Sequence, residues 1–460
     1  MTDLTTRTLN RLGQQLRGRL SRPGDRGYAA ATAIWAKPVG RTPRAVVHCQ
    51  TPEDVQLAIR AARHCDLPLS VRGGGHDWAG RALCDGIVID LSGMNRVRVA
   101  SDGHTARIAG GARAADVVAV TDRLGVAPVT GSVGAVGMAG LTLGGGYGPL
   151  IGRFGLTLDN LVGAEIVLAD GRLAFAARDN EDELLWALRG GGGNFGVVTA
   201  MHHRLHSLPS VRTGMLLYPF GEAETVLAGC AEIAAAAPDE LTVQLGCVVG
   251  PDGAPLVMVL PTWCGAPDEG EAQLSAFLQL GTLLAGSLDE MPYGRSLTMF
   301  DSYLANGQRV LMETCWVPEL DYRCVDGFIE AMVAAVSQGC AIFTHEFRGA
   351  ASRVAAEATA FGLRRDHVLI EILATFADDS DEQAEARHRQ WARDALASFD
   401  AVALPGGYPN LLAGDDADRA AQSYGGNAGR LIDAKRRYDP DNVFRSAIPL
   451  PARDVVAAIH

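Results

Sequence analysis

The stretch Ser70-Val-Arg-Gly-Gly-Gly-His-Asp-Trp-Ala-Gly80 places three glycines directly before a histidine, between apolar runs at 69–72 and 87–91 that favour β-strands. Because glycine has no Cβ atom, its backbone N–H groups can converge and approach a phosphate closely. Two more clusters follow, Gly144-Gly-Gly-Tyr-Gly148 and Gly190-Gly-Gly-Gly-Asn-Phe-Gly196. Such repeated turns indicate a large, flat or phosphorylated ligand, although tight turns between strands would use the same residues.

The third cluster contains a GxGxxG pattern at Gly191, Gly193 and Gly196. In a dinucleotide-binding βα unit this pattern follows a strand and opens a helix. Here a capped helix is expected over 180–189 and a strand over 197–208, which is the reverse order. A nucleotide bound here must therefore be held by another scaffold.

Composition excludes several classes of protein. The chain has 460 residues, 48% of them hydrophobic, which predicts a folded protein of two or three domains. Its net charge of −12 argues against a nucleic-acid partner, and no apolar run is long enough to cross a membrane. The only lysines are Lys37 and Lys435, and neither stands in a phosphate-binding P-loop or in a promising place for pyridoxal chemistry.

The cysteines and histidines indicate neither a disulfide framework nor a metal centre. The nine cysteines are dispersed, odd in number and free of CxxC pairs, as expected for reduced thiols. The first twenty residues contain four arginines and no apolar core of a secretory signal, so we expect a cytoplasmic protein. His202, His203 and His206 lie in a predicted strand, where they would not converge on a metal.

The pattern of elements changes near residue 209. Before it, a helix begins at Thr51 and a hairpin over 164–177 turns at Asp170-Gly171. After it, longer elements alternate, which predicts an α+β unit with a mostly antiparallel sheet. The expected strands are 241–250, 255–263, 341–347 and 367–376, and the expected helices are 269–280, 321–337, 381–398 and 427–438.

Several ordered motifs resemble one family. The stretches 70–92, 140–161 and 186–199, together with Tyr408-Pro-Asn410 and Tyr438-Asp-Pro-Asp-Asn-Val-Phe444, are similar to the berberine-bridge-enzyme-like flavoproteins. These belong to the vanillyl-alcohol-oxidase and p-cresol-methylhydroxylase superfamily. The resemblance implies a split FAD-binding domain, residues 1–208 and 405–460, with a substrate domain inserted at 209–404.

The resemblance also implies how the cofactor is held. His76 would carry FAD through a bond from its ring to the flavin 8α-methyl group. Val133 stands where many relatives have a second attachment cysteine, so a single covalent bond is expected. Met138 falls where relatives often carry Val, Ile or Leu beside the oxygen-reactive carbon. The FAD-binding residues predicted in this way are Arg72, Gly73, Gly74, Gly75, His76, Asp77, Gly134, Gly137, Met138, Gly140, Leu141, Gly144, Gly145, Gly146, Gly148, Leu158, Asn160, Gly196, Val197, Val198, Tyr408, Asn410 and Asn442.

Removing a hydride from an alcohol or amine carbon needs a base for the accompanying proton. The candidates are Tyr408, which matches the family's Tyr-x-Asn motif, and Glu371 and Glu346, which stand in apolar strands. The expected activity is hydride transfer from a small, polyketide-like molecule to flavin N5, with O2 as the electron acceptor. The alternatives are a carbohydrate oxidase or flavin dehydrogenase, and a non-redox cyclase on the same scaffold.

Overall fold

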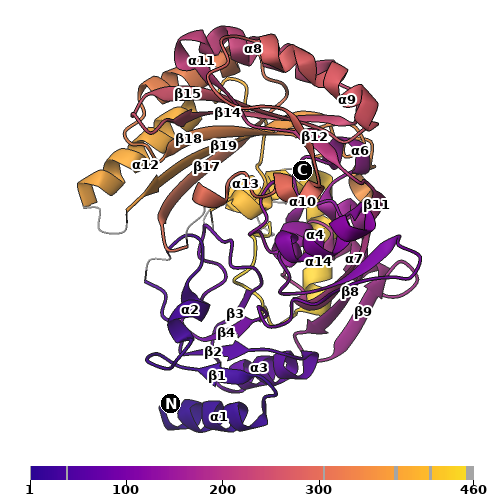
Figure 1. The fold of residues 1–460 in the computed structure, drawn as a ribbon. Helices are drawn as coiled ribbons and strands as arrows, with labels where there is room; N and C mark the ends of the chain where they lie inside the picture. The colour runs from indigo at the N-terminus through magenta and orange to yellow at the C-terminus, as the bar shows by residue number, and fades with distance from the viewer. Residues whose placement is uncertain (1, 38–39, 304–305, 378–381, 414–416, 452–460) are drawn as a thin grey trace.

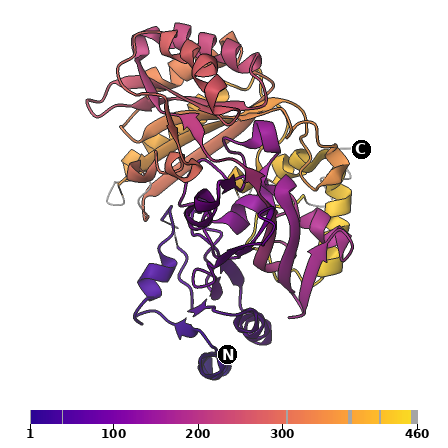
Figure 2. The same cartoon turned by 45° about the vertical axis from the view of Figure 1, so that its right-hand side comes forward.

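The computed structural model describes residues 2–37, 40–303, 306–377, 382–413 and 417–451. The chain folds into two layered parts, one above the other in Figure 1. The C-terminal segment, drawn in yellow, returns beside the N-terminal part, and the turned view in Figure 2 shows the same arrangement. The last residues of the predicted C-terminal segment, 452–460, lie outside the described residues.

The N-terminal part begins with a four-stranded sheet in the order β1-β2-β4-β3, in which β2, β4 and β3 are parallel. Its strands are short apolar runs buried on both faces, as parallel strands require: α1 and α3 share one core with Val47 and Ile89, and Ala31 of α2 packs with Val46 and Val88 on the other face. Thr51 accepts a hydrogen bond from the Asp54 N–H and starts α3 with a capping box, as predicted. The bounds are α1 (Thr2–Gln15), β1 (Arg19–Ser21), α2 (Tyr28–Thr32), β2 (Ala45–His48), α3 (Pro52–His64), β3 (Leu69–Arg72) and β4 (Ile87–Asp90).

A second sheet of five antiparallel strands has the order β5-β6-β10-β8-β9. Its β8–β9 hairpin confirms the predicted hairpin, and Gly171 adopts a φ of 84° in the turn. The remaining elements of this part are β5 (Val97–Val99), β6 (Thr105–Ala109), α4 (Ala114–Thr121), β7 (Val126–Ala127), α5 (Met138–Gly144), α6 (Ile151–Phe154), β8 (Leu161–Leu168), β9 (Leu173–Ala177), α7 (Asp182–Leu188), β10 (Gly196–Arg204) and β11 (His206–Ser207).

The inserted part is built on a large antiparallel sheet, which confirms the predicted α+β class. The strand order is β16-β12-β15-β14-β18-β19-β17, and β13 also pairs with β15. The bounds are β12 (Val211–Thr213), β13 (Leu216–Pro219), α8 (Ala223–Ala235), β14 (Leu241–Val249), β15 (Pro255–Trp263), α9 (Pro267–Leu274), β16 (Asp289–Met291), α10 (Tyr293–Ser296), β17 (Arg309–Val317), α11 (Tyr322–Val333), β18 (Cys340–Phe347), β19 (His367–Phe376) and α12 (Glu382–Ala397).

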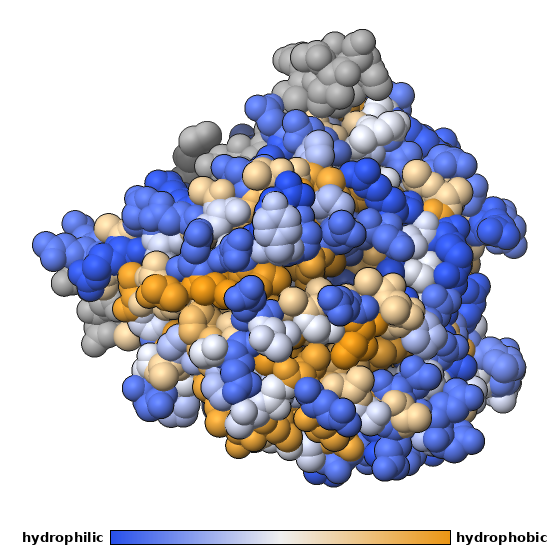
Figure 3. All heavy atoms as spheres, turned by 90° about the horizontal axis from the view of Figure 1, so that it is seen from above, coloured by the Kyte–Doolittle hydropathy of each residue, from blue (hydrophilic) through white to orange (hydrophobic). Residues whose placement is uncertain are grey.

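The two faces of this sheet have different neighbours. Ile342 and Ile370 face the core formed with α8, α11 and α12, whereas the alternate residues Phe343 and Glu371 face the N-terminal part. Seen from above, the surface is mixed: hydrophilic side chains cover much of it, and apolar side chains gather in a band and in smaller patches between them (Figure 3). Among the described helices, none is long and apolar enough to cross a membrane.

Two predicted helices have different ends in the structure. The helix expected over 321–337 stops at Val333, with Ala334 as its C-cap, and Ser337 lies beyond it, where its hydroxyl accepts a hydrogen bond from the Gly339 N–H and contacts His388. The helix expected over 269–280 is α9 followed by a 3-10 turn, Ser275–Gln279.

The C-terminal segment adds α13 (Ala417–Tyr424) and α14 (Ala428–Tyr438). Lys435, in α14, donates hydrogen bonds to the Asn194 and Phe444 carbonyls at 2.8 and 3.1 Å, and to the Asp439 carboxylate at 2.5 Å. Asp439 in turn accepts from the Val443 and Phe444 N–H groups. One lysine therefore joins the third glycine cluster to the end of the chain.

Candidate active site

A cavity of about 940 Å³ lies between the N-terminal part and the large sheet. Residues from the segments 73–78, 131–141 and 192–198 line one side, and residues from the segment 444–448 of the returning chain close part of it. The cavity-facing residues of β13, β14, β15, β17, β18 and β19 line the other side. Segments that are far apart in the sequence therefore form a single site.

The glycines on the N-terminal side form a cradle. A Cβ atom on Gly74 would lie 2.5 Å from the Cα atom of Gly137, so the two loops can approach only as glycines. A Cβ atom on Gly140 would meet nothing within 4 Å, and one on Gly193 only Ala447 at 3.9 Å. Because Gly140 and Gly193 both line the cavity, side chains there would fill space that a ligand can use.

The imidazole of His76 stacks on the indole of Trp35, with ring centroids 4.4 Å apart and planes inclined by 8°. The Trp35 N–H donates to the Gly75 carbonyl at 2.9 Å, so the stack is anchored through the backbone. Among the described residues, neither ring nitrogen of His76 forms a hydrogen bond. Burial lowers the pKa of His76 to about 4, an effect that Glu371 opposes and Arg113 reinforces, which keeps the imidazole neutral.

The residues around His76 hold its loop in place. Arg72 lies behind the loop and donates to the Asp90 carboxylate at 3.0 Å, and both side chains are buried. Asp77 accepts hydrogen bonds from the Ala79 and Ala82 N–H groups, while burial raises its pKa. Arg81 donates to the Asn410 carbonyl at 3.0 Å. The loop is thus joined to the returning C-terminal segment.

Tyr408 presents a protonated phenol at the cavity. Its oxygen accepts hydrogen bonds from the Gly146 N–H and the Asn410 amide, both at 2.9 Å. These contacts lower its pKa, but burial outweighs them and raises the value to about 12. Because the oxygen acts as the acceptor in both contacts, the phenol proton can be donated to a ligand. The geometry favours a hydrogen-bond donor over a base at this position.

Beside Tyr408, Tyr147 also lines the cavity, with the two ring centroids 4.9 Å apart. The Tyr147 hydroxyl lies 2.7 Å from Nε2 of His367. Nδ1 of His367 lies 2.7 Å from the Arg365 carbonyl and must donate to it, so Nε2 accepts from Tyr147. The Tyr147 proton is therefore already engaged, unlike that of Tyr408.

Glu371 and His345 form a pair on the sheet side of the cavity. Nε2 of His345 lies 3.2 Å from a carboxylate oxygen of Glu371, and both side chains are mostly buried but reach the cavity. They come from neighbouring strands, β18 and β19, and face the same side of the sheet. A carboxylate beside an imidazole in a largely apolar cavity is an arrangement that can take up and pass on a proton.

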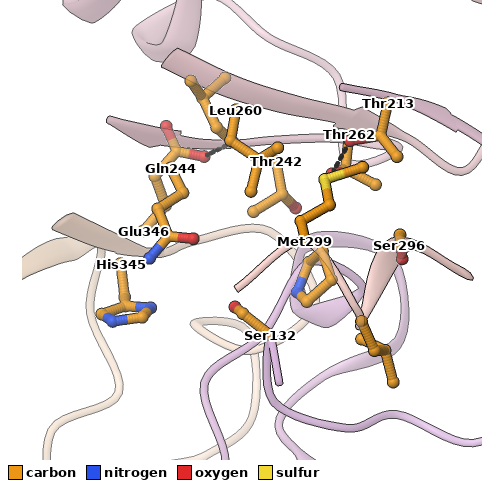
Figure 4. A pocket seen from close by; sticks show the side chains of 14 residues that line it. Ser132, Thr213, Thr242, Gln244, Leu260, Thr262, Ser296, Met299, His345 and Glu346 are labelled. Atoms are coloured by element: carbon orange, nitrogen blue, oxygen red, sulfur yellow. Dashed lines mark hydrogen bonds between the residues drawn. The ribbon is translucent and has the colours of Figure 1, made fainter. Parts of the chain in front are cut away.

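Glu346 lies elsewhere. Its carboxylate accepts a hydrogen bond from the Val243 N–H at 2.7 Å and borders a smaller, adjoining cavity of about 30 Å³, which shares Ser132, Gln244 and His345 with the large one. Figure 4 shows this small space between Ser132 below and the threonines of the sheet above, with the His345 ring turned away from them. Burial raises the pKa of Glu346 to about 7. The two predicted glutamates therefore occupy different cavities.

Comparison with known proteins agrees with this geometry. Residues 43–176 match the family described as FAD binding domain, and residues 407–451 match the one described as berberine and berberine like. (R)-6-hydroxynicotine oxidase of Paenarthrobacter nicotinovorans is 30% identical over 94% of this chain and 96% of its own. The chain belongs to the berberine-bridge-enzyme-like FAD-linked oxidoreductases.

Solved structures support the same assignment. That of 6-hydroxy-D-nicotine oxidase from Arthrobacter nicotinovorans has a TM-score of 0.83 at 28% identity, covering 94% of this chain and 97% of that one. The berberine-bridge-enzyme-like protein 1 of Physcomitrella patens has a TM-score of 0.86 at 22% identity, covering 97% and 100%. The second likeness concerns the fold. The protein is therefore an FAD-linked oxidoreductase of the p-cresol-methylhydroxylase superfamily.

The cavity fits FAD, because it combines glycine-lined backbone with space that no side chain fills. Of the predicted residues, those that line it are Gly73, Gly74, Gly75, His76, Asp77, Gly137, Gly140, Leu141, Gly196, Val197, Val198, Tyr408, Asn410 and Glu371. Those that do not are Arg72, Gly134, Met138, Gly144, Gly145, Gly146, Gly148, Leu158, Asn160, Asn442 and Glu346.

The predicted residues outside the cavity mostly support those inside it. Gly145 and Gly146 lie behind Tyr408, where a Cβ atom on Gly145 would lie 2.7 Å from its ring. Met138 is fully buried in the core of the N-terminal part and does not line the cavity. Asn442 is an exposed turn residue with a φ of 50°.

Sequence analysis missed Trp35, Arg81 and Gln244, which all line the cavity. Trp35 and Gln244 lie outside every glycine-rich motif, so no local signal marks them, whereas Arg81 directly follows the stretch 70–80 and its position beside that motif could have indicated it. It also gave no metal ligands, and the described residues contain no group of three His, Cys, Asp or Glu side chains that could hold a metal. His202 contacts Glu165, whereas His206 contacts Asn160, so these histidines face different partners.

Proposed function

We propose that this protein is a covalent flavoprotein oxidase that acts on an alcohol or amine carbon of an apolar, natural-product-like molecule. The observation that carries the proposal is the Glu371–His345 pair, which faces the same cavity as His76 and Tyr408. Glu371 is close enough to His76 to influence its pKa, so the pair and the attachment residue share one space.

Bound FAD supplies a two-electron oxidant that can take a hydride from carbon. Side chains of the protein take up the substrate proton and donate a hydrogen bond to the reacting group. The Glu371 carboxylate, hydrogen-bonded to His345, takes the O–H or N–H proton of the substrate. Tyr408 donates its phenol proton to a substrate heteroatom or a cofactor oxygen and so fixes the orientation of the reacting group.

Attachment through His76 is supported by the state of its ring. A neutral imidazole has a nucleophilic nitrogen, and burial in this cavity keeps His76 neutral at physiological pH. A single attachment is supported by Val133, which lines the cavity where a second attachment would require a cysteine. Cys340 is the one cysteine among the described cavity-lining residues, and it lies on the large sheet.

An apolar substrate is supported by the sheet side of the cavity. Sugar recognition needs many hydrogen-bonding groups, but most of the lining side chains there are Met, Leu, Val and Phe. O2 as the electron acceptor is supported by the names of relatives, such as (R)-6-hydroxynicotine oxidase. That name also makes an amine carbon a reasonable target beside an alcohol carbon.

The first experiment is acid precipitation of the purified protein, followed by absorbance and peptide mass spectrometry. Yellow colour that stays with the precipitate, on a peptide containing His76, supports the tether; colour that is wholly released overturns it. Oxygen uptake is then measured with panels of hydroxylated aromatics, amines and sugars. Preferred sugar oxidation would favour the carbohydrate oxidase, and turnover with an artificial acceptor but not O2 would favour the dehydrogenase.

An anaerobic arm separates oxidation from a non-redox reaction. If the substrate bleaches the flavin absorbance at about 450 nm, this result supports oxidation. Product that forms without bleaching would favour the cyclase.

We further propose that the protein works in the cytoplasm. The support is that all nine cysteines, each within the described residues, are free thiols, which suits a reducing compartment. Cell fractionation with an antibody against the protein tests this, and recovery outside the cytoplasm would overturn it.

A further inference from the structure

The sheet side of the cavity is long and runs along two strands. Ala341, Phe343 and His345 of β18 line it, with Gly339 just before that strand, and on β19, Leu369, Glu371, Leu373 and Thr375 do. The register pairs Phe343 with Glu371 and Ala341 with Leu373. Since a strand rises about 3.3 Å per residue, the six residues from His345 to Gly339 span about 20 Å.

The chemistry changes along this length. The polar groups of the reactive end are Gln244, His345 and Glu371, and the far end is marked by Gln338 and Thr375. No charged side chain lies on the sheet between these ends, within the part of the chain that the structure describes. The side chains between them are Met215, Leu217, Val248, Leu256, Met258, Met312, Ala341, Phe343 and Leu373. We call these nine residues the apolar trough.

We propose that the apolar trough binds the body of the substrate, an extended and mainly hydrocarbon molecule with one hydroxyl or amine end placed at Glu371 and His345. The placement of the reactive end rests on the proposed function. The length and apolar character of the ligand rest on the trough alone. Burying such a body removes apolar surface from water on both partners, which favours binding roughly in proportion to length.

The trough suits a chain or linear ring system more than a compact molecule. A small substrate bound beside Glu371 would leave the apolar side chains of Met258, Met312 and Leu373 facing water. No contact with the substrate would then offset the unfavourable free energy of that exposure. Three of the nine side chains are methionines, which adapt to irregular shapes because they are unbranched. The trough therefore selects for length and tolerates variation in shape.

The test uses the FAD-loaded protein and a series of 4-n-alkylresorcinols with side chains of one to about twelve carbons. Binding is followed from the absorbance change of the bound flavin, without oxygen. Each added methylene is expected to lower Kd about three- to fourfold, until the chain fills the trough. Affinity that does not depend on chain length, or tighter binding of xylobiose than of the long resorcinols, overturns the proposal.

Two variants measure how far along the trough the alkyl chain of the ligand reaches. Ala341→Trp places a large ring about 13 Å from His345, and Thr375→Trp places one near the far end. Ala341→Trp is expected to end the gain in affinity at shorter chains than Thr375→Trp does. Val336→Trp, at a site 41% exposed, is the control and should follow the unmodified protein.

Binding and turnover separate the two proposals. Length-dependent binding of the resorcinols without oxidation of any alcohol or amine would leave the trough in place and count against the proposed oxidation. Oxidation of short alcohols, together with a Kd that does not change along the resorcinol series, would support the proposed oxidation and count against the trough. If Ala341→Trp does not fold, Met258→Ala is used, and it should weaken long chains by several-fold while leaving the one-carbon probe unchanged.

Discussion

The indole of Trp35 covers one face of the His76 imidazole at a centroid distance of 4.4 Å, almost parallel to it. No hydrogen bond from the described residues orients that imidazole, so ring stacking supplies the orientation. The backbone of Trp35 is fixed because its main-chain N–H donates to the Gly75 carbonyl. The residue expected to carry FAD is therefore positioned by a side chain 41 positions earlier in the chain.

Replacing Trp35 should reduce covalent attachment of FAD. In Trp35→Ala the imidazole gains rotational freedom, and the fraction of flavin retained after acid precipitation at a fixed time should fall about tenfold or more. Trp35→Phe keeps an aromatic ring and should retain most of the attachment. If Trp35→Ala retains as much flavin as the unmodified protein, stacking has no role in the attachment.

Replacing Glu371 should slow substrate oxidation. Glu371→Gln keeps the size and a hydrogen bond to His345 but cannot take up a proton, so the rate of flavin reduction should fall about 10²- to 10⁴-fold. The amount of bound FAD should not change, and the absorbance spectrum of the flavin measures this occupancy independently of the rate. Glu346→Gln is the matched control, because Glu346 borders the other cavity. Equal losses in both variants would contradict the assignment of the base.

Glu346 should make the protein less stable at alkaline pH. Its pKa is about 7 in the folded protein, above the ordinary value of 4.5, so the folded state holds the proton more tightly than the unfolded chain does. The stability that this provides at low pH is lost as the pH rises from about 4.5 through 7.

Glu346→Gln removes this titration while keeping an acceptor for the Val243 N–H. Its free energy of unfolding should exceed that of the unmodified protein by up to about 3 kcal/mol at about pH 8, and by about 1 kcal/mol at about pH 5. Denaturant titrations at both pH values measure the difference. A difference that does not change with pH would show that Glu346 does not titrate in this range.

Lys435 should be needed to keep the C-terminal segment in place. Lys435→Met leaves the Asp439 carboxylate, whose side chain is fully buried, without its cation, at an expected cost of about 3 kcal/mol or more in the free energy of unfolding. FAD retention should also fall, because Phe444 and Asn194 lose their shared donor. The double variant Lys435→Met with Asp439→Asn should recover part of the stability. A double variant no more stable than Lys435→Met would argue against the buried pair.

Much of the fold could be predicted, because its signals are local. The β8–β9 hairpin follows from one Asp-Gly turn between alternating strands, and β19 follows from an apolar run, with both ends as expected. The helix expected over 321–337 was too long: it ends at Val333, and Ser337 lies in the turn after it, where its side chain accepts a hydrogen bond from the Gly339 N–H.

The candidate site was only partly predictable. Glu346 and Glu371 look alike in sequence, each a carboxylate in an apolar strand. Strand parity and register place Glu371 beside His345 in the large cavity and Glu346 under the Val243 N–H. Which face of the sheet each glutamate side chain takes depends on the pairing register with the neighbouring strand, and what it meets depends on the position of the opposite domain. The residues next to each glutamate in the sequence determine neither of these.

By itself, the sequence determined the glycine loops that can approach a ligand and the α+β character of the inserted part, because spacing and backbone freedom act over a few residues, and its resemblance to a known family indicated the class of cofactor. Only the tertiary structure decided which side chains meet: Trp35 with His76, His345 with Glu371, and Lys435 with Asn194. These pairs are separated by 26 to 241 positions, and packing of whole sheets and helices brings them together.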